Sequence, residues 1–333
     1  SKLISACIII FISSPAPYIL ILSTIITHIY NISFHYSVII STITSIVYIY
    51  FGGYRSIIKT DMLQFVFMFS GFIIMLYYLI NTYGGFHFLI NNVPERNLSF
   101  TGNLPLGYIL SWMMIAFITL IDPSIFQRAY SANSRSVVKN GILISIIFWI
   151  IFDFLAITTG LYASAIIDKS TMNPYLYLGD SILPPLAKNI FYISIISIVM
   201  STIDSFSFVS AFTIGKDIFK KKSLKNVQLG LFITAILSII IIYNFKKVID
   251  MWYVFGSIAA SSLLIPFLLI LFAPHKKSNY PEICLIAPII INITWIYLGN
   301  PLNLDSMYPG IVVSGLINYL SLKRVSNKSL NVS

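Results

Sequence analysis

Long apolar runs are the feature that most restricts how this chain can fold. Ten stretches are dominated by aliphatic and aromatic side chains, and a helix needs about 20 such residues to cross a bilayer. Only 10% of the 333 residues are charged, against about 25% in soluble domains. The sequence therefore predicts an all-α integral membrane protein forming one transmembrane domain, residues 1–333. The predicted spans are 3–26, 36–51, 62–82, 105–121, 138–166, 186–218, 227–243, 251–273, 282–299 and 306–322.

The basic residues predict an orientation for these spans. With the N-terminus inside, sixteen of the 21 lysines and arginines fall in segments facing the cytoplasm and five in segments facing outward. Loops on the cytoplasmic side of a membrane carry such an excess. We therefore expect a multi-pass protein of the cell membrane with both ends of this chain cytoplasmic. The same placement explains the net charge of +10 without a nucleic-acid partner, and nothing in the sequence indicates an oligomeric state.

A polar stripe interrupts the apolar run at 186–218. Its members recur every three or four residues and so share one face of a helix. They supply hydroxyl and carboxylate oxygens, which suit a small hard cation; the alternative is that the hydroxyls only pack helices or bond to their own backbone. A buried carboxylate needs a cation, a proton or a donor, so the acid favours a functional site. The stripe consists of Ser194, Ser197, Ser201, Asp204 and Ser205, with Thr202 at its border.

Other polar residues mark further points of interest. Asp153 lies near the middle of 138–166, and it either belongs to a cation pathway or is protonated and bonded to a neighbouring helix. The pair Asp122-Pro123 is expected to end the helix at 105–121, because the residue before proline avoids the helical region. Transporters often place substrate and ion sites at interrupted helices of this kind.

Three stretches together resemble the sodium/solute symporter family. Residues 52–64 are similar to its Gly-Gly…Thr-Asp-x-x-Gln segment, and Gln127-Arg128 with the four residues after it is similar to its Gln-Arg run. The third is Met-Ser-Thr-x-Asp-Ser at 200–205, followed by Asp-Ile-Phe at 217–219. The motifs stand in the family's order, and the likeness covers about 3–275.

The resemblance implies a fold of five plus five helices in inverted repeats. The ten spans then correspond to the last ten of thirteen: 3–82 resembles core helices three to five, 105–273 core helices six to ten, and 282–322 two peripheral helices. The family's first two core helices would be missing, and its sodium site lies between the first and the eighth. We therefore expect a partial fold of this type.

The resemblance also implies roles for individual residues. Ser201 and Thr202 match hydroxyl ligands of the main sodium site, and Ile198 matches its backbone-carbonyl ligand. Asp61 matches an acid linked to sodium release or to a second sodium, and Asp204 and Ser205 are assigned to the same secondary or exit path. The expected substrate pathway is formed by Trp112, Ile115, Ile118, Thr119 and Tyr253.

The predicted function is sodium-coupled symport of a small organic solute by alternating access, with Na⁺ as coupling ion and no other cofactor. Ile115 and Ile118 stand where sugar carriers have polar or aromatic side chains, which argues against a sugar. One alternative is an inactive, truncated fragment of such a symporter. A multispan membrane enzyme is a weaker alternative, because no polar cluster at one membrane interface is apparent. An unrelated permease should lack the paired motifs.

Overall fold

The computed structural model describes residues 2–167, 173–219, 223–245, 247–273 and 276–324. These residues are mostly helical. Lys220, Lys221, Lys222 and Lys328, counted above on the cytoplasmic side, lie outside the described residues. The first half of the described chain forms α1 (Lys2–Ile12), α2 (Ala16–Tyr30), α3 (Phe34–Tyr83), α4 (Phe86–Asn92), α5 (Glu95–Leu98), α6 (Leu106–Ala116), the 3-10 turn η1 (Phe117–Ile121), α7 (Pro123–Ser131) and α8 (Arg135–Ile166).

The second half continues in the same style and ends in a small antiparallel sheet. It forms α9 (Pro174–Ile182), α10 (Pro185–Thr213), the π-helical turn η2 (Ile214–Ile218), α11 (Leu224–Asn244), α12 (Val248–Ala259), the π-helical turn η3 (Ala260–Leu264), α13 (Ile265–Phe272), β1 (Lys276–Ser278), α14 (Pro281–Tyr297), the 3-10 turn η4 (Pro301–Asn303), α15 (Met307–Ser321) and β2 (Leu322–Arg324). The β1 and β2 strands pair with Lys277 opposite Lys323.

Seven helical segments in the described part of the chain are long and apolar enough to cross a membrane. This confirms a helical, multi-pass membrane protein. The apolar α14 is shorter, with 17 residues, and α15 has 15. The seven segments are Lys2–Tyr30, Phe34–Tyr83, Leu106–Ser131, Arg135–Ile166, Pro185–Ile218, Leu224–Asn244 and Val248–Phe272.

Gly53 divides the 50-residue helix α3 into two segments. Its φ of 56° and ψ of −155° are not helical, and only glycine adopts such a conformation readily. The predicted spans 36–51 and 62–82 leave residues 52–61 as a loop on the cytoplasmic side. The structure is instead helical on both sides of Gly53, so a single glycine makes the bend. An unbroken helix of this length would span about 75 Å at 1.5 Å per residue, roughly twice a bilayer.

The two segments of α3 run in opposite directions along α10. Before the bend, Ser45 lies near Met200 and Ile49 packs farther along, in a cluster with Ala211. After the bend, Asp61 contacts Ser201 and Met68 contacts Ser194, so the contacts proceed toward the N-terminus of α10. The bend at Gly53 therefore reverses the chain and presents two faces of α3 to the same helix.

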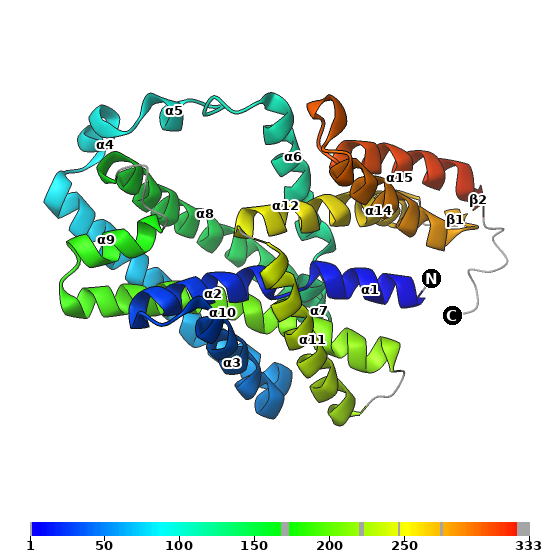
Figure 1. The fold of residues 1–333 in the computed structure, drawn as a ribbon. Helices are drawn as coiled ribbons and strands as arrows, with labels where there is room; N and C mark the ends of the chain where they lie inside the picture. The colour runs from blue at the N-terminus through cyan, green and yellow to red at the C-terminus, as the bar shows by residue number, and fades with distance from the viewer. Residues whose placement is uncertain (1, 168–172, 220–222, 246, 274–275, 325–333) are drawn as a thin grey trace.

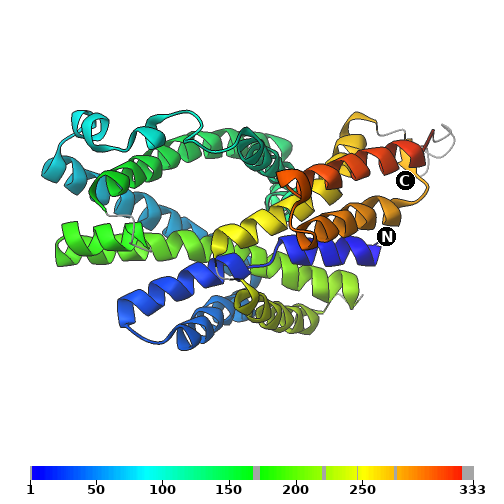
Figure 2. The ribbon, with the colours of Figure 1, turned by 45° about the horizontal axis from the view of Figure 1, so that its top comes forward.

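The α10 helix is the centre around which the other helices pack (Figure 1). It contacts α1, α2, α3, α7, α9 and α11. Small residues permit close approach: Gly230 of α11 lies against the Ala211 backbone, and Gly71 of α3 lies against Ser194. Close packing of this kind is the main force that joins helices in lipid. The α14 and α15 helices lie side by side against η3 (Figure 2).

Asp122-Pro123 ends the preceding helix, as predicted. The chain tightens into η1, and α7 then starts at Pro123. The Asp122 carboxylate accepts a 2.7 Å hydrogen bond from the Ser124 backbone N–H, which caps the new helix. This break sets the position of every side chain on α7, including Arg128.

Candidate functional site

The second segment of α3 and α10 pack antiparallel with a fixed register. The Ser201 hydroxyl donates a 2.8 Å hydrogen bond to Oδ1 of Asp61. Seven residues later on α3 and seven earlier on α10, the Ser194 hydroxyl donates at 3.4 Å to the Met68 carbonyl. Gly71 makes the crossing close, since a Cβ there would lie 3.2 Å from the Phe191 Cα. The register therefore places the Asp61 carboxylate against the polar stripe of α10.

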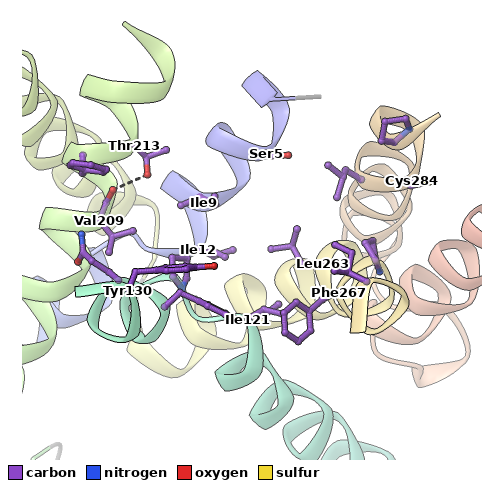
Figure 3. Close-up of a pocket in the computed structure, with 18 of the residues that line it drawn as sticks. Ser5, Ile9, Ile12, Ile121, Tyr130, Val209, Thr213, Leu263, Phe267 and Cys284 are labelled. Atoms are coloured by element: carbon purple, nitrogen blue, oxygen red, sulfur yellow. Dashed lines mark hydrogen bonds between the residues drawn. The ribbon is translucent and has the colours of Figure 1, made fainter. Parts of the chain in front are cut away.

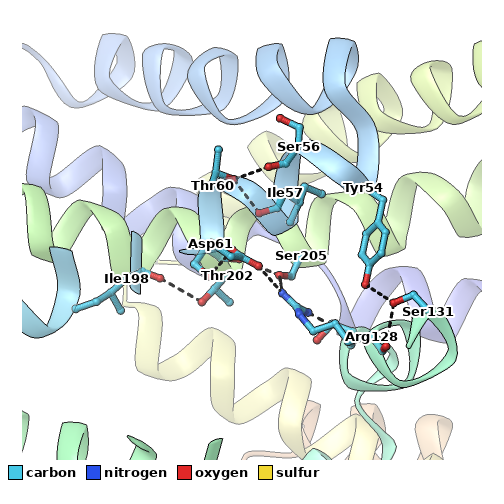
Figure 4. A network of polar contacts seen from close by, with 12 residues as sticks. Tyr54, Ser56, Ile57, Thr60, Asp61, Arg128, Ser131, Ile198, Thr202 and Ser205 are labelled. Atoms are coloured by element: carbon cyan, nitrogen blue, oxygen red, sulfur yellow. Dashed lines mark hydrogen bonds and ion pairs between the residues drawn. The ribbon is translucent and has the colours of Figure 1, made fainter. Parts of the chain in front are cut away.

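Arg128 of α7 joins the same network (Figure 4). One guanidinium nitrogen, Nη2, lies 2.9 Å from Oδ2 of Asp61 and 2.7 Å from the Ser205 hydroxyl. The Asp61 side chain is 21% exposed and that of Arg128 is 40% exposed. The Asp61 carboxylate thus accepts from the Ser201 hydroxyl through Oδ1 and pairs with the Arg128 guanidinium through Oδ2.

The remaining hydroxyls of the site bond to their own helix. Thr202 donates to the Ile198 carbonyl at 3.3 Å, and Ser205 donates to the Ser201 carbonyl at 2.9 Å. A hydroxyl or carbonyl oxygen in such a bond still has a free lone pair. One turn of α10 therefore gathers the oxygens of Ile198, Ser201 and Thr202 beside the Asp61 carboxylate.

Gln64 is a further neighbour of Asp61, and it is not among the site residues predicted from the sequence. It lies three residues after Asp61, and the register sets it opposite Ile198, three residues before Ser201. Its Oε1 is buried and has no hydrogen-bond partner among the described residues. The Thr-Asp-x-x-Gln spacing indicates that Gln64 lies beside Asp61, because positions i and i+3 share a helix face.

Asp204 is fully buried, as the stripe predicts, but it is not part of this network. Its side chain is 0% exposed, and neither carboxylate oxygen has a hydrogen-bond partner among the described residues. The structure thus brings Ser205 to Asp61 through Arg128, and it leaves Asp204 without a bond to this network. Asp153, by contrast, is exposed on α8.

Three of the five residues expected in the substrate pathway come together where α6 meets α12. The Trp112 and Tyr253 rings lie 5.7 Å apart between centroids. Ile115 packs on Gly256, where a Cβ would come within 2.8 Å of its side chain. Ile118 and Thr119 lie in the next element, the 3-10 turn η1.

A cavity of about 1200 Å³ lies beside α7 (Figure 3). Ser5 and Ile9 of α1, Gln127 and Tyr130 of α7, and Thr213 of α10 are among the residues that line it. Gln127 precedes Arg128, and Thr213 lies two turns beyond Ser205 on α10. The cavity therefore reaches the neighbourhood of the network, and Tyr54 of α3 also lines it.

The fold and this site define a class of protein. A multi-pass helical membrane protein that gathers a carboxylate, a guanidinium and hydroxyls at one helix crossing is built like an ion-coupled transporter. A model of the Sodium:solute symporter family matches residues 2–279. The chain belongs to this family, which confirms the resemblance carried by the three motifs.

Individual relatives agree with this membership. The chain is 26% identical over 254 residues to the sodium/pantothenate symporter of Haemophilus influenzae, covering 70% of this chain and 52% of that protein. It is 24% identical over 337 aligned positions to the sodium/proline symporter of Staphylococcus aureus, covering 88% of this chain and 63% of that protein. The chain thus spans between half and two thirds of the length of these curated relatives. Both of these relatives are named as symporters.

Proposed function

We propose that this chain acts in sodium-coupled symport of a small organic solute by alternating access. The observation that carries the proposal is the Ser201–Asp61 hydrogen bond of 2.8 Å between α10 and α3, next to the Ile198–Thr202 pair. It places a carboxylate beside the oxygens that a small hard cation prefers.

The main sodium site in this proposal consists of the Ile198 carbonyl and the hydroxyls of Ser201 and Thr202. All three lie within about one turn of α10, which fixes their spacing. Asp61 and Ser205 form a secondary position on the cytoplasmic exit path. Asp204, which is buried without a partner, is assigned to the same path as a carboxylate that binds a proton or cation as α10 moves.

Coupling follows from differential binding. Sodium drives a conformational change only if it binds one state more tightly than the other. Sodium on α10 stabilises the outward-open state, solute binds near the midplane, and sodium then leaves past Asp61. We place both ends of this chain in the cytoplasm.

The solute pathway runs between α6 and α12, along Trp112, Ile115 and Tyr253, with Ile118 and Thr119 on the η1 turn. The relatives are named for proline and pantothenate, so these are the first solutes to test. The apolar Ile115, held against Gly256, favours them over a sugar.

We also propose ten spans arranged as part of a five-plus-five inverted repeat. The reversal at Gly53 supports counting α3 as two spans, because its segments run in opposite directions along α10. The broken helices α6–η1–α7 and α12–η3–α13 support the comparison with core helices six and ten.

Uptake into proteoliposomes tests the proposal. The purified chain is reconstituted, and radiolabelled proline and pantothenate are offered under an inward sodium gradient or an equal potassium gradient. We expect sodium-dependent accumulation that the double variant Ser201→Ala, Thr202→Ala abolishes. Uptake that is equal in potassium would contradict sodium coupling. Sodium binding without uptake of either solute would contradict the symport assignment for this chain while preserving the ion site.

A further inference from the structure

The Arg128 guanidinium occupies a position that a cation could fill. It bonds to Oδ2 of Asp61 at 2.9 Å and to the Ser205 hydroxyl at 2.7 Å. A carboxylate oxygen and a hydroxyl oxygen are also ligands for sodium. The arginine therefore satisfies the oxygens that the proposed function assigns to the secondary sodium position.

The single negative charge of Asp61 does not neutralise both the Arg128 guanidinium and a sodium ion bound beside it. The guanidinium is charged at any physiological pH, and like charges a few ångströms apart in a partly buried site repel strongly. No second acid shares the Asp61–Arg128 ion pair among the described residues. Sodium at Asp61 and Arg128 at Asp61 are thus mutually exclusive.

The helix that carries Arg128 is short and has non-helical residues on both sides. The nine-residue α7 is separated from η1 by the non-helical Asp122 and from α8 by the non-helical segment 132–134. Its link to α3 beyond the ion pair is a 3.0 Å hydrogen bond between the Tyr54 and Ser131 hydroxyls. Tyr130 is exposed, and the cavity of about 1200 Å³ adjoins Gln127, Tyr130 and Ser131. A small rotation of α7 toward this space withdraws Arg128 without unfolding a span.

We propose that Arg128 is a tethered cation that competes with sodium for Asp61 and Ser205. Sodium enters this position only when α7 withdraws the arginine, and the returning arginine displaces sodium. The inference rests on the proposed function and adds to it the way in which sodium is released from this position. Arg128 thereby sets how weakly the site holds sodium in the state described here.

Sodium binding to the purified full chain tests this inference. Binding of ²²Na⁺ is measured by scintillation proximity for the wild type, Arg128→Gln, Arg128→Lys and Arg135→Gln. Arg135 is exposed at the start of α8 and makes no ion pair among the described residues, so it is the matched control. We expect Arg128→Gln to raise sodium affinity by about tenfold, within the usual range of coupling between competing ligands. Arg128→Lys should keep most of the competition, and Arg135→Gln should bind as the wild type does.

Two further measurements distinguish competition between Arg128 and sodium from a purely structural ion pair. Millimolar guanidinium chloride should lower sodium affinity again in Arg128→Gln, because it restores the missing cation. In the double variant Asp61→Asn, Arg128→Gln, the gain in affinity should vanish. Melting temperatures measured in detergent show whether each variant is folded.

The outcomes distinguish this inference from the function on which it rests. If the wild type binds sodium and Arg128→Gln binds it equally or more weakly, the tethered-cation inference is wrong and sodium coupling stands. If no variant binds sodium, the proposed function itself fails for this chain. If only Arg128→Gln binds measurably, the inference is supported in its strongest form.

Discussion

The Ser201 hydroxyl lies 2.8 Å from Oδ1 of Asp61, although the two residues are 140 positions apart in the chain. The contact depends on the reversal at Gly53, which turns the second segment of α3 antiparallel to α10. It joins two motifs that are separate in the sequence into one polar site. The sodium assignment depends most directly on this pair.

Replacing Ser201 and Thr202 together by alanine should weaken sodium binding by at least about tenfold, which is 1.4 kcal/mol. The change removes two hydroxyl oxygens and leaves the Ile198 carbonyl without its 3.3 Å donor. Isothermal titration calorimetry with sodium measures it. Ser238→Ala is the control, since Ser238 is a buried hydroxyl on α11 that donates to the Thr234 carbonyl. An equal loss in the control would attribute the effect to packing.

Asp61→Asn should reduce sodium affinity while leaving the fold intact. The amide oxygen can still accept from Ser201, but the negative charge that attracts the cation is lost. The broken ion pair should cost only about 1 kcal/mol or less, because Asp61 and Arg128 are partly exposed. Sodium dependence of uptake measures the first effect and thermal unfolding the second. Asp217→Asn is the control, because Asp217 is an exposed acid in η2, after the end of α10; it should change neither. Unaltered sodium dependence in Asp61→Asn would remove Asp61 from the ion path.

Gln64→Leu should also weaken sodium binding, by about threefold to tenfold, as expected for a modest coupling energy. Its Oε1 is buried without a partner opposite Ile198, so an approaching cation would supply the missing interaction. Gln64→Glu keeps an oxygen there and should retain or strengthen binding. If Gln64→Leu instead binds sodium normally and unfolds at a higher temperature, the oxygen is only a buried polar group without a ligand.

Gly71→Ala should destabilise the protein by about 1–3 kcal/mol, the usual cost of overpacking. The added Cβ would collide with the Ser194 side chain and lie 3.2 Å from the Phe191 Cα, forcing α3 away from α10. Gly141→Ala on α8 is the matched control, because a Cβ there meets nothing within 4 Å. It should be neutral or slightly stabilising. Equal unfolding temperatures for both variants would show that the α3–α10 contact is looser than described.

Asp180, on α9 outside the seven candidate spans, should make stability depend on pH. Burial raises its pKa, but hydrogen bonds from Tyr192, His28 and Lys188 outweigh burial and hold the pKa below its ordinary value. A lowered folded-state pKa means that the stabilisation is complete above the ordinary value, about 4, and is lost as the pH falls through the folded-state pKa. Melting temperatures between pH 7 and pH 3 measure this loss. Asp180→Asn should melt lower than the wild type at pH 7 and fall less on acidification; identical profiles would contradict the assignment.

Local features of the fold followed from the sequence because they depend on local chemistry. Apolar length predicted a helical membrane protein, and the described residues contain seven of the helices that could cross a membrane. Asp122-Pro123 predicted the helix break, and the spacing of Ser194, Ser197 and Ser205 predicted a buried polar stripe. The shape of the 52–61 segment did not follow, because one glycine with positive φ can replace a loop. The contact between Trp112 and Tyr253 also required the packing of α6 on α12.

The sequence by itself determined that the chain enters a membrane as helices and carries the motifs of its family. Hydrophobic length and the spacing of polar residues are properties of the chain, independent of its packing. Only the tertiary structure decided that Arg128 contacts Asp61 and Ser205, that Gln64 is left without a partner, and that Asp204 stays apart. These relationships depend on the register and crossing of helices. The close contact of small residues such as Gly71 and Ser194 sets this register. Because these residues belong to different helices, no periodic pattern within either helix reveals the contact.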